Sequence, residues 1–289
     1  MNYRLYRGKE VMLCDGLRIA FNTLAEKTFQ LSFEHWYQDG YWTESNLPYT
    51  LFDGNTAVAN VSVNRMELLW QGKQRHYIQL GTVMTDPAYR NRGLARFLMR
   101  EVLQDWESRC DGMFLFANES VLDFYPRFGF QMQAEYEFRA AVENPAGSAR
   151  RLNLSLPQDR ELLERRYAAT NPYSALQVIC NFGLLMFYCG SFLKDCVYYE
   201  PTSDAIVIAE QEGKVLHCLD AFCNAGMALS EVIRLAAPPG TESVVLGFPP
   251  MDASPYQAEP VAKGSDALFV LQNKENPFAQ QKLRFPELA

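Results

Sequence analysis

The sequence predicts an α/β protein with mixed sheets, and three observations lead to this fold class. Residues 78–106 contain a short apolar run, a basic loop and an amphipathic repeat, which predict a strand, a loop and a helix. Residues 49–85 change to a period of two with interspersed turn residues, which predicts hairpins. The second half of the chain repeats this order of elements. We therefore expect two α/β domains.

Turn residues mark the strands of the first half. Asp53-Gly54-Asn55 and Gln71-Gly72-Lys73 each lie between two strand-like runs, so each is expected to close an antiparallel hairpin. The second hairpin ends at Thr85, because the following Asp86-Pro87 breaks the strand. After the helix, further strands are expected at residues 112–117 and 133–141.

A change in composition sets the expected domain boundaries. Residues 141–157 carry Pro, Gly, Ser and paired Arg without periodicity, which is typical of a linker. The sequence therefore predicts a first domain at 1–142, a linker at 143–157 and a second domain at 158–289. The strands expected in the second domain include 214–222, 243–248 and 267–272.

The composition narrows the classes of partner. The chain has 289 residues, 48% hydrophobic and 21% charged, which describes a soluble globular protein. Its 27 basic and 34 acidic residues give a net charge of −7, so neither nucleic acid nor an anionic membrane is expected as a partner. Seven cysteines without a C-x-x-C pair, a polar N-terminus and no span-length apolar stretch indicate a reducing cytoplasm. Three histidines without metal-like spacing indicate no metal site.

The loop before the predicted helix has the features of an anion site. Residues 90–95 read RNRGLA. The first N–H groups of a helix have no internal acceptor, and the helix dipole places partial positive charge there. Gly93 removes a side chain where a phosphate would approach, and Arg90, Arg92 and Arg96 supply cations. A diphosphate with a ribose phosphate fits this pattern.

Two blocks of this sequence resemble the GNAT superfamily of acyl-CoA-dependent N-acyltransferases. Arg90–Ala95 fits the R/Q-x-x-G-x-G/A loop of that family. Residues 114–130, FLFANESVLDFYPRFGF, match the next family block, which is a strand, an Asn and a short helix carrying F-Y-x-x-x-G-F. The two blocks stand in the family order with one helix between them. The resemblance covers about residues 1–140 and implies a GNAT fold there.

The second half is interpreted as a degenerate GNAT-like domain, which makes the expected architecture a tandem. After Cys223 the chain enters the next predicted helix through Asn224-Ala225-Gly226. This passage has no arginine and no R/Q-x-x-G-x-A loop. A diphosphate would find neither cations nor loop amides there, so CoA is expected to bind the first domain alone.

The resemblance implies acetyl-CoA as cosubstrate and indicates where it binds. In the family, the pantetheine arm lies on the free edge of the strand that here ends at Thr85, and an Asn at the end of the next strand contacts that arm or a water. Asn118 holds this position, although a role as helix N-cap explains it equally. The expected cofactor-binding residues are Val83, Met84, Thr85, Arg90, Asn91, Arg92, Gly93, Leu94, Ala95, Arg96 and Asn118.

Tyr125 aligns with the tyrosine that the family places near the CoA sulfur as general acid. A phenol with a pKa of about 10 can protonate a departing thiolate, and the alternative is a buried structural tyrosine. No motif identifies the general base. The candidates are Glu34, His35, Glu44, Glu67 and Glu119. The aromatic residues between Phe33 and Trp42 either line an acceptor pocket or, as ordinary aromatics do, fill the core.

The expected function is that of an N-acetyltransferase, which moves an acetyl group from acetyl-CoA to a primary amine of a small molecule or peptide. The alternative is a non-catalytic CoA-binding or interaction protein that retains the GNAT fold. The fold itself does not select the acceptor.

Overall fold

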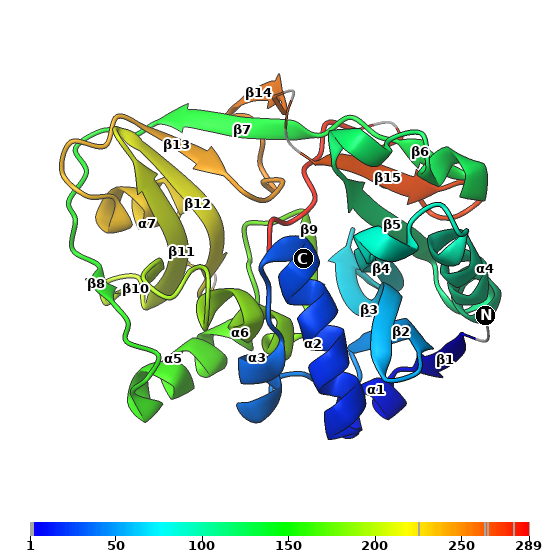
Figure 1. Ribbon diagram of the computed structural model, residues 1–289. Coiled ribbons are helices and arrows are strands. Elements are labelled where there is room, and N and C mark those ends of the chain that lie inside the picture. The colour runs from blue at the N-terminus through cyan, green and yellow to red at the C-terminus, as the bar shows by residue number, and fades with distance from the viewer. Residues whose placement is uncertain (1–2, 225, 263, 265, 280, 289) are drawn as a thin grey trace. The chain divides into compact units, whose positions relative to one another are not determined.

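The computed structural model describes residues 3–224, 226–262, 264, 266–279 and 281–288 (Figure 1). The chain divides into two compact units. The first unit holds the chain up to Met66, Arg75–Gln133 and Gly264–Asn276, and the second holds Glu67–Gln74, Ala134–Lys263 and the chain from Pro277 onward. Each unit contains a mixed sheet with helices, so the predicted α/β fold class is confirmed.

Seven of the eight described strands of the first sheet follow one path. They are β1 (Arg4–Arg7), β2 (Asn46–Asp53), β3 (Thr56–Trp70), β4 (Lys73–Thr85), β5 (Gly112–Ala117), β15 (Ala267–Leu271) and β6 (Phe130–Met132), and the sheet follows this order. β4 and β5 run parallel, whereas β1–β2, β2–β3, β5–β15 and β15–β6 are antiparallel. The hairpin turns at Gly54 and Gly72 have positive φ values of 59° and 69°, as tight turns that favour glycine require.

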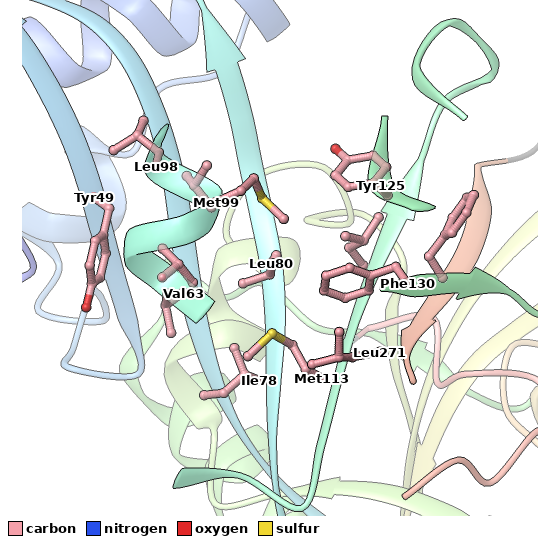
Figure 2. Close-up of a cluster of buried hydrophobic side chains, with 14 of the residues drawn as sticks. Tyr49, Val63, Ile78, Leu80, Leu98, Met99, Met113, Tyr125, Phe130 and Leu271 are labelled. Carbon is pink, nitrogen blue, oxygen red and sulfur yellow. The ribbon is translucent and has the colours of Figure 1, made fainter. Parts of the chain in front are cut away.

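The helices of the first unit are α1 (Lys9–Leu13), α2 (Asp15–Phe29), α3 (Glu34–Gln38) and α4 (Leu94–Trp106). The buried side of α4 carries Leu98 and Met99, which join a core with Leu80 of β4 and Met113 of β5 (Figure 2). Phe97 of the same helix is 44% exposed and lies outside this core. This helix therefore fixes the end of the predicted anion loop on the core.

A second sheet forms the second unit, in the order β14-β7-β13-β12-β11-β10-β8. These strands are β14 (Gln257–Pro260), β7 (Tyr136–Ala141), β13 (Ser243–Leu246), β12 (Val215–Phe222), β11 (Ala205–Glu212), β10 (Val197–Glu200) and β8 (Arg150–Arg151). Its helices are α5 (Pro157–Tyr167), α6 (Phe182–Cys189) and α7 (Leu229–Ala236), and β9 (Leu176–Ile179) pairs with Glu67–Trp70. An antiparallel meander, α7 and the parallel strand β13 repeat the layout of the first unit.

Two predicted strands belong to the other unit from the one expected. Residues 133–141 were assigned to the first domain, but β7 pairs with β13 and β14 in the second sheet. Residues 267–272 were assigned to the second domain, but β15 lies between β5 and β6 in the first sheet. The reason is physical: side-chain alternation fixes which face of a strand is buried, and it carries no information about the neighbouring strand.

The observed units also differ from the predicted division at residues 142–158. The segment 143–157, predicted as a linker, lies along the second unit, where the N–H of Ala146 donates to the carbonyl of Arg234 over 2.8 Å. Within it, Arg150–Arg151 form the edge strand β8 and pair with β10. The local composition of this segment indicated that it lacks periodicity. It could not indicate these hydrogen bonds, because their partners are distant in the sequence.

Candidate functional site

The parallel strands β4 and β5 separate before either of them ends. Their pairing runs from Tyr77 with Gly112 to Leu80 with Leu115, whereas β4 continues to Thr85. Beyond Leu80, no described strand pairs with this edge of β4, which is where an extended ligand could add as a further strand. The predicted residues Val83, Met84 and Thr85 all lie in this stretch.

The loop after β4 has the conformation of an anion site. Asn91 and Gly93 both adopt left-handed conformations, with φ values of 62° and 78°. Gly93 is the N-cap of α4, and the first intrahelical bond runs from Phe97 N to its carbonyl over 3.0 Å. The N–H groups of residues 94–96 therefore have no intrahelical acceptor and are directed out of the helix start. No atom lies within 4 Å of a Cβ placed on Gly93, so the loop faces open space.

The three predicted arginines play different parts in this loop. Arg92 turns back onto its own loop, donating to the carbonyl of Ala88 over 2.9 Å and stacking 4.7 Å above the Tyr89 ring. Arg90 is exposed, with its Nε 3.5 Å from the carbonyl of Thr85. Arg96 is exposed on the first turn of α4 and faces a hollow. Arg92 thus stabilises the loop, while Arg96 is placed to meet a ligand.

The hollow beside Arg96 contains cations that the motif did not include. It measures about 280 Å³ and is lined by Arg96, Arg100, Arg127 and Phe128. Three guanidinium groups around one aromatic ring suit a phosphate attached to a flat heterocycle. The i, i+4 spacing of Arg96 and Arg100 on the predicted helix was the available signal for Arg100. Arg127 and Phe128 come from the 3-10 turn Tyr125–Phe128, whose position depends on the fold.

Tyr125 has a buried ring and an unbonded hydroxyl. The residue is 4% exposed, and its ring packs 5.9 Å from Phe269 and 5.2 Å from Phe124. Its hydroxyl points away from the neighbouring Phe130 and Leu271 (Figure 2), and none of the described residues hydrogen-bonds it. Burial, assisted by the charge of Asp266, raises the pKa of Tyr125 to about 12. The phenol therefore keeps its proton at any physiological pH.

Asn118 stands at the end of β5, as predicted, and serves as an N-cap. Its Oδ1 accepts hydrogen bonds from the backbone N–H of Ser120 (3.1 Å) and from the Ser120 hydroxyl (2.6 Å). The side-chain oxygen of Asn118 thus acts as the N-cap acceptor, as the second interpretation of this residue expected. Its side chain is exposed, and the Nδ2 amide remains the group that a ligand would use.

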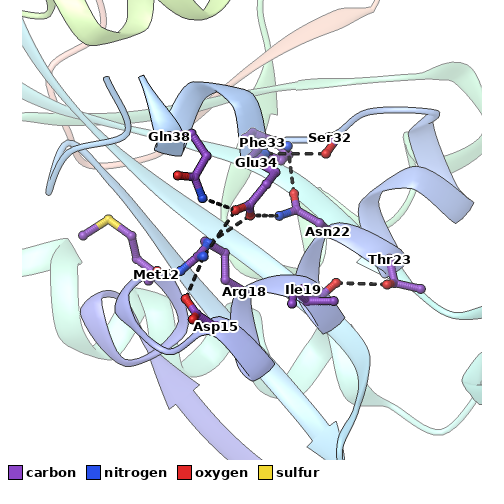
Figure 3. A network of polar contacts seen from close by, with 10 residues as sticks. All are labelled: Met12, Asp15, Arg18, Ile19, Asn22, Thr23, Ser32, Phe33, Glu34 and Gln38. Atoms are coloured by element: carbon purple, nitrogen blue, oxygen red, sulfur yellow. Dashed lines mark hydrogen bonds and ion pairs between the residues drawn. The ribbon is translucent and has the colours of Figure 1, made fainter. Parts of the chain in front are cut away.

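The candidate base Glu34 is held in a polar network on α2 and α3 (Figure 3). Its carboxylate accepts from Arg18 Nε (2.9 Å), from Asn22 Nδ2 (3.2 Å) and from Gln38 Nε2 (2.7 Å). The hydrogen bond from Arg18 holds the pKa of Glu34 below its usual range. A carboxylate so held is a weak base, and the network instead fixes α3 against α2.

The aromatic residues of the same region divide between the core and its rim. Phe33, Trp36 and Trp42 are buried, with exposed fractions of 4%, 7% and 4%, and Trp36 stacks on Trp42 at 5.7 Å. Tyr37 and Tyr41 are partly exposed. Phe33, Trp36 and Trp42 therefore belong to the core.

The second unit has a comparable parallel pair, but its free edge is occupied. Pairing between β12 and β13 ends at Cys218 and Leu246. There the N–H of Gly247 donates to the carbonyl of Cys218 (2.8 Å), and the carbonyl of Gly247 accepts from the N–H of Glu287 (2.9 Å). The C-terminal segment thus takes a hydrogen bond that a ligand would need. Ala225, part of the passage into α7, lies outside the described residues.

The described residues contain neither a metal-ligand cluster nor a membrane-spanning helix. Among them, no group of three or more His, Cys, Asp or Glu side chains is placed to hold a metal ion. No helix in the described part of the chain combines the length and apolarity needed to cross a membrane.

Comparison with known proteins agrees with this geometry. Residues 16–133 match the model of the acetyltransferase (GNAT) domain, which includes both β4 and the loop at the start of α4. No curated protein matches the chain significantly.

Solved structures resemble the chain along most of its length. A conserved protein from Enterococcus faecalis has 14% identity and a TM-score of 0.60, over 93% of this chain and 72% of that one. GCN5-related N-acetyltransferases from Anabaena variabilis and Kribbella flavida each have 16% identity, with TM-scores of 0.58 and 0.57. They match 92% and 93% of this chain and 72% and 71% of their own. At these identities the likeness establishes the fold, in both halves of the chain.

Proposed function

Because residues 16–133 of the chain are a GNAT acetyltransferase domain, we propose that this protein transfers an acetyl group from acetyl-CoA to a primary amine. One observation carries the proposal: the left-handed loop at Asn91 and Gly93 presents N–H groups of α4 that have no intrahelical acceptor, shortly after the stretch of β4 that lies beyond its pairing with β5. A diphosphate and an extended amide-containing arm are the two chemical parts that such a site fits.

Each part of the cosubstrate has a counterpart in the first unit. The N–H groups of residues 94–96 bind the diphosphate, with Arg90 and Arg96 as counter-charges. The hollow beside Arg100 and Arg127 takes the ribose phosphate, and the adenine stacks on Phe128. The free edge of β4 at residues 83–85 pairs with the pantetheine amides, as an added strand would.

The reaction then needs one proton for the leaving group. The neutral amine attacks the thioester carbon, so that a C–N bond forms and the C–S bond breaks. Tyr125 donates its proton to the departing thiolate, because its hydroxyl has no competing partner among the described residues. The excess proton of the amine passes to solvent, since the network around Glu34 leaves that carboxylate a poor acceptor, and solvent returns one proton to the Tyr125 phenolate.

The acceptor class is a small molecule or a peptide with a primary amine. The net charge of −7 permits a cationic acceptor without selecting one. All seven cysteines are free thiols, and we place the protein in the reducing cytoplasm on that ground.

The test combines binding with product detection. Calorimetry with acetyl-CoA is expected to give one site per chain. Incubation with acetyl-CoA labelled in the acetyl group and a panel of polyamines, amino acids, aminoglycosides and peptides is expected to give at least one labelled amide by mass spectrometry.

Each result has a distinct meaning. Binding without any labelled product would favour the alternative, a non-catalytic CoA-binding protein. Absence of acetyl-CoA binding would refute the proposal as a whole. Two equivalents bound per chain would show that the second unit also holds a CoA site.

A further inference from the structure

One residue in the part of β4 beyond its pairing with β5 has an unusual backbone conformation. Thr82 has a φ of 48°, in the left-handed region. A β-branched residue rarely adopts this conformation, because its side chain crowds the backbone. Such a conformation persists only where the surrounding structure holds it, and it is most common at functional sites. The contacts of Thr82 therefore show what holds it.

The carbonyl of Thr82 is bound by a buried side chain of β3. Asn60 Nδ2 donates to this carbonyl and to the Ser62 hydroxyl, both over 3.0 Å. Asn60 Oδ1 accepts from the hydroxyl of Thr50 over 2.7 Å. Thr50, Asn60 and Ser62 are all 0% exposed. Both ends of the amide are thus engaged by protein groups.

The orientation of the Asn60 amide follows from its partners. A backbone carbonyl only accepts hydrogen bonds, so the group that faces Thr82 has to be the NH₂ end. The opposite orientation would place two acceptors against each other in a buried position, which is strongly unfavourable. The side chain therefore acts as a fixed donor.

A fixed carbonyl also fixes the N–H of the next residue. In a trans peptide, the C=O and N–H bonds point in opposite directions. The Thr82 carbonyl points at Asn60 Nδ2, so the N–H of Val83 points away from the Asn60 side chain. Among the described residues, the pairing of β4 with β5 ends at Leu80, two residues before Thr82. The N–H of Val83 therefore lies in the stretch of β4 that β5 no longer covers, with its direction set by the Thr82 carbonyl.

We propose that Asn60 is a positioning residue that aims the N–H of Val83 at the thioester carbonyl of the acyl donor. The assignment rests on the proposed function, since it requires an acyl-CoA on the free edge of β4. A donor held in advance stabilises the negative charge that develops on this oxygen, and it needs no reorganisation during the reaction. Asn60 itself touches no substrate.

The test measures the polarisation of the bound carbonyl. The infrared stretch of acetyl-CoA carrying ¹³C at the carbonyl is compared free and bound, for the unaltered protein, Asn60→Leu and Asn64→Leu. Asn64 is the matched control, because it lies on the same strand and donates to Gln79 over 2.7 Å, with no hydrogen bond to Thr82. Binding of free CoA, which lacks the carbonyl, and melting curves are measured in parallel.

The unaltered protein and Asn64→Leu are expected to lower the carbonyl frequency on binding. Asn60→Leu is expected to lose at least half of this shift while it binds free CoA within about threefold, and kcat should fall roughly ten- to hundredfold. Thr50→Val, which frees one end of the Asn60 amide, is expected to lose a smaller part of the shift. It supplies the comparison if Asn60→Leu does not fold.

Three results would overturn the assignment. The first is a full shift in Asn60→Leu, or in Thr50→Val if only that variant folds. The second is no shift in the unaltered protein with acetyl-CoA bound, which would leave the proposed function standing. The third is failure of the unaltered protein to bind acetyl-CoA, which would remove the proposed function and this assignment together.

Discussion

Among single residues, Tyr125 joins a buried ring to a hydroxyl that no described residue binds. Tyr125→Phe removes the hydroxyl alone, so the packing against Phe269 and Phe124 is retained. We expect the melting temperature and the affinity for acetyl-CoA to stay near those of the unaltered protein, because no hydrogen bond is lost. Turnover should fall roughly 10²- to 10⁴-fold, which is the usual contribution of a general acid.

Steady-state kinetics and melting curves for the Phe variant decide between the two roles of Tyr125. An unchanged kcat with a lowered melting temperature would assign the residue to the core. The pKa of about 12 adds a second check, because it keeps the hydroxyl protonated at pH values where a tyrosine of ordinary pKa ionises. Activity should therefore show no loss from this group near pH 10.

Glu34 supports a different kind of prediction, one of stability. Arg18 is 4% exposed and pairs with Glu34, so Glu34→Gln leaves a buried guanidinium with a weaker partner. We expect a loss of about 1–2 kcal/mol in unfolding free energy, below the range for fully buried pairs because Glu34 is 35% exposed. Activity per folded molecule should not change, whereas a general base at this position would lose most of it.

The same pair gives a pH dependence with a definite sign. The folded state lowers the pKa of Glu34, so it favours the charged carboxylate. The stabilisation is complete above the unfolded-state pKa of about 4.3 and is lost as the pH falls through the lower folded-state value. Urea unfolding at several pH values should show the gap between the unaltered protein and Glu34→Gln closing below about pH 4. A gap that widens in acid would contradict this account.

Among the elements, the start of α4 can be tested with a pair of glycines. Gly93→Val and Gly54→Val both place a β-branched residue at positive φ, 78° and 59°, and neither Cβ meets an atom within 4 Å. Each should lose about 1–2 kcal/mol of stability for conformational reasons alone. Only Gly93→Val should also lose the rise in melting temperature that acetyl-CoA produces in the unaltered protein. Equal shifts in both variants would remove the loop from the site.

The hollow on α4 predicts a preference between two ligands. CoA and dephospho-CoA differ by the phosphate on the ribose. We place this phosphate against Arg100 and Arg127. Arg100→Ala combined with Arg127→Ala should weaken CoA about tenfold and leave the ligand without this phosphate nearly unaffected. Arg109→Ala is the control, because Arg109 stacks near Trp106 and does not line the hollow. Calorimetry at low and high salt measures both affinities.

The elements also show which parts of the site could be predicted from the sequence. The loop at Gly93, the helix after it and the position of Tyr125 were predicted because their signals are local: spacing, turn residues and one family motif. Asn60 was not predicted, because its partner Thr82 lies on a neighbouring strand and only strand pairing brings the two together. Arg127 was missed for the same reason, since only the fold places it beside Arg96.

Across the whole chain, the first sheet depends on a strand from near the C-terminus. β15 lies between β5 and β6, and Phe269 packs on Tyr125. The following residues fasten this segment, since Glu275 accepts two hydrogen bonds from Arg75 (2.8 and 2.9 Å) and Lys274 donates to the carbonyl of Cys110 (3.0 Å). A fragment of residues 1–142 should therefore lack a cooperative unfolding transition.

Thermal unfolding of that fragment, followed by circular dichroism, tests this prediction. The control is the same measurement after addition of a peptide of residues 264–276. The peptide should restore cooperative unfolding, since it supplies the missing strand between two existing edges. A fragment that unfolds cooperatively on its own would show that β15 is dispensable for the first unit. The family motifs could not reveal this dependence, because they end before residue 140.

The late position of β15 has a consequence for biosynthesis. A ribosome extends a chain by about 5–20 residues per second, so β15 emerges on the order of ten seconds after β6. During that interval the inner edges of β5 and β6 have no neighbour and are exposed to other nascent chains. The first unit to begin is therefore the last to be completed, and translation speed over residues 133–271 should govern the yield of active protein.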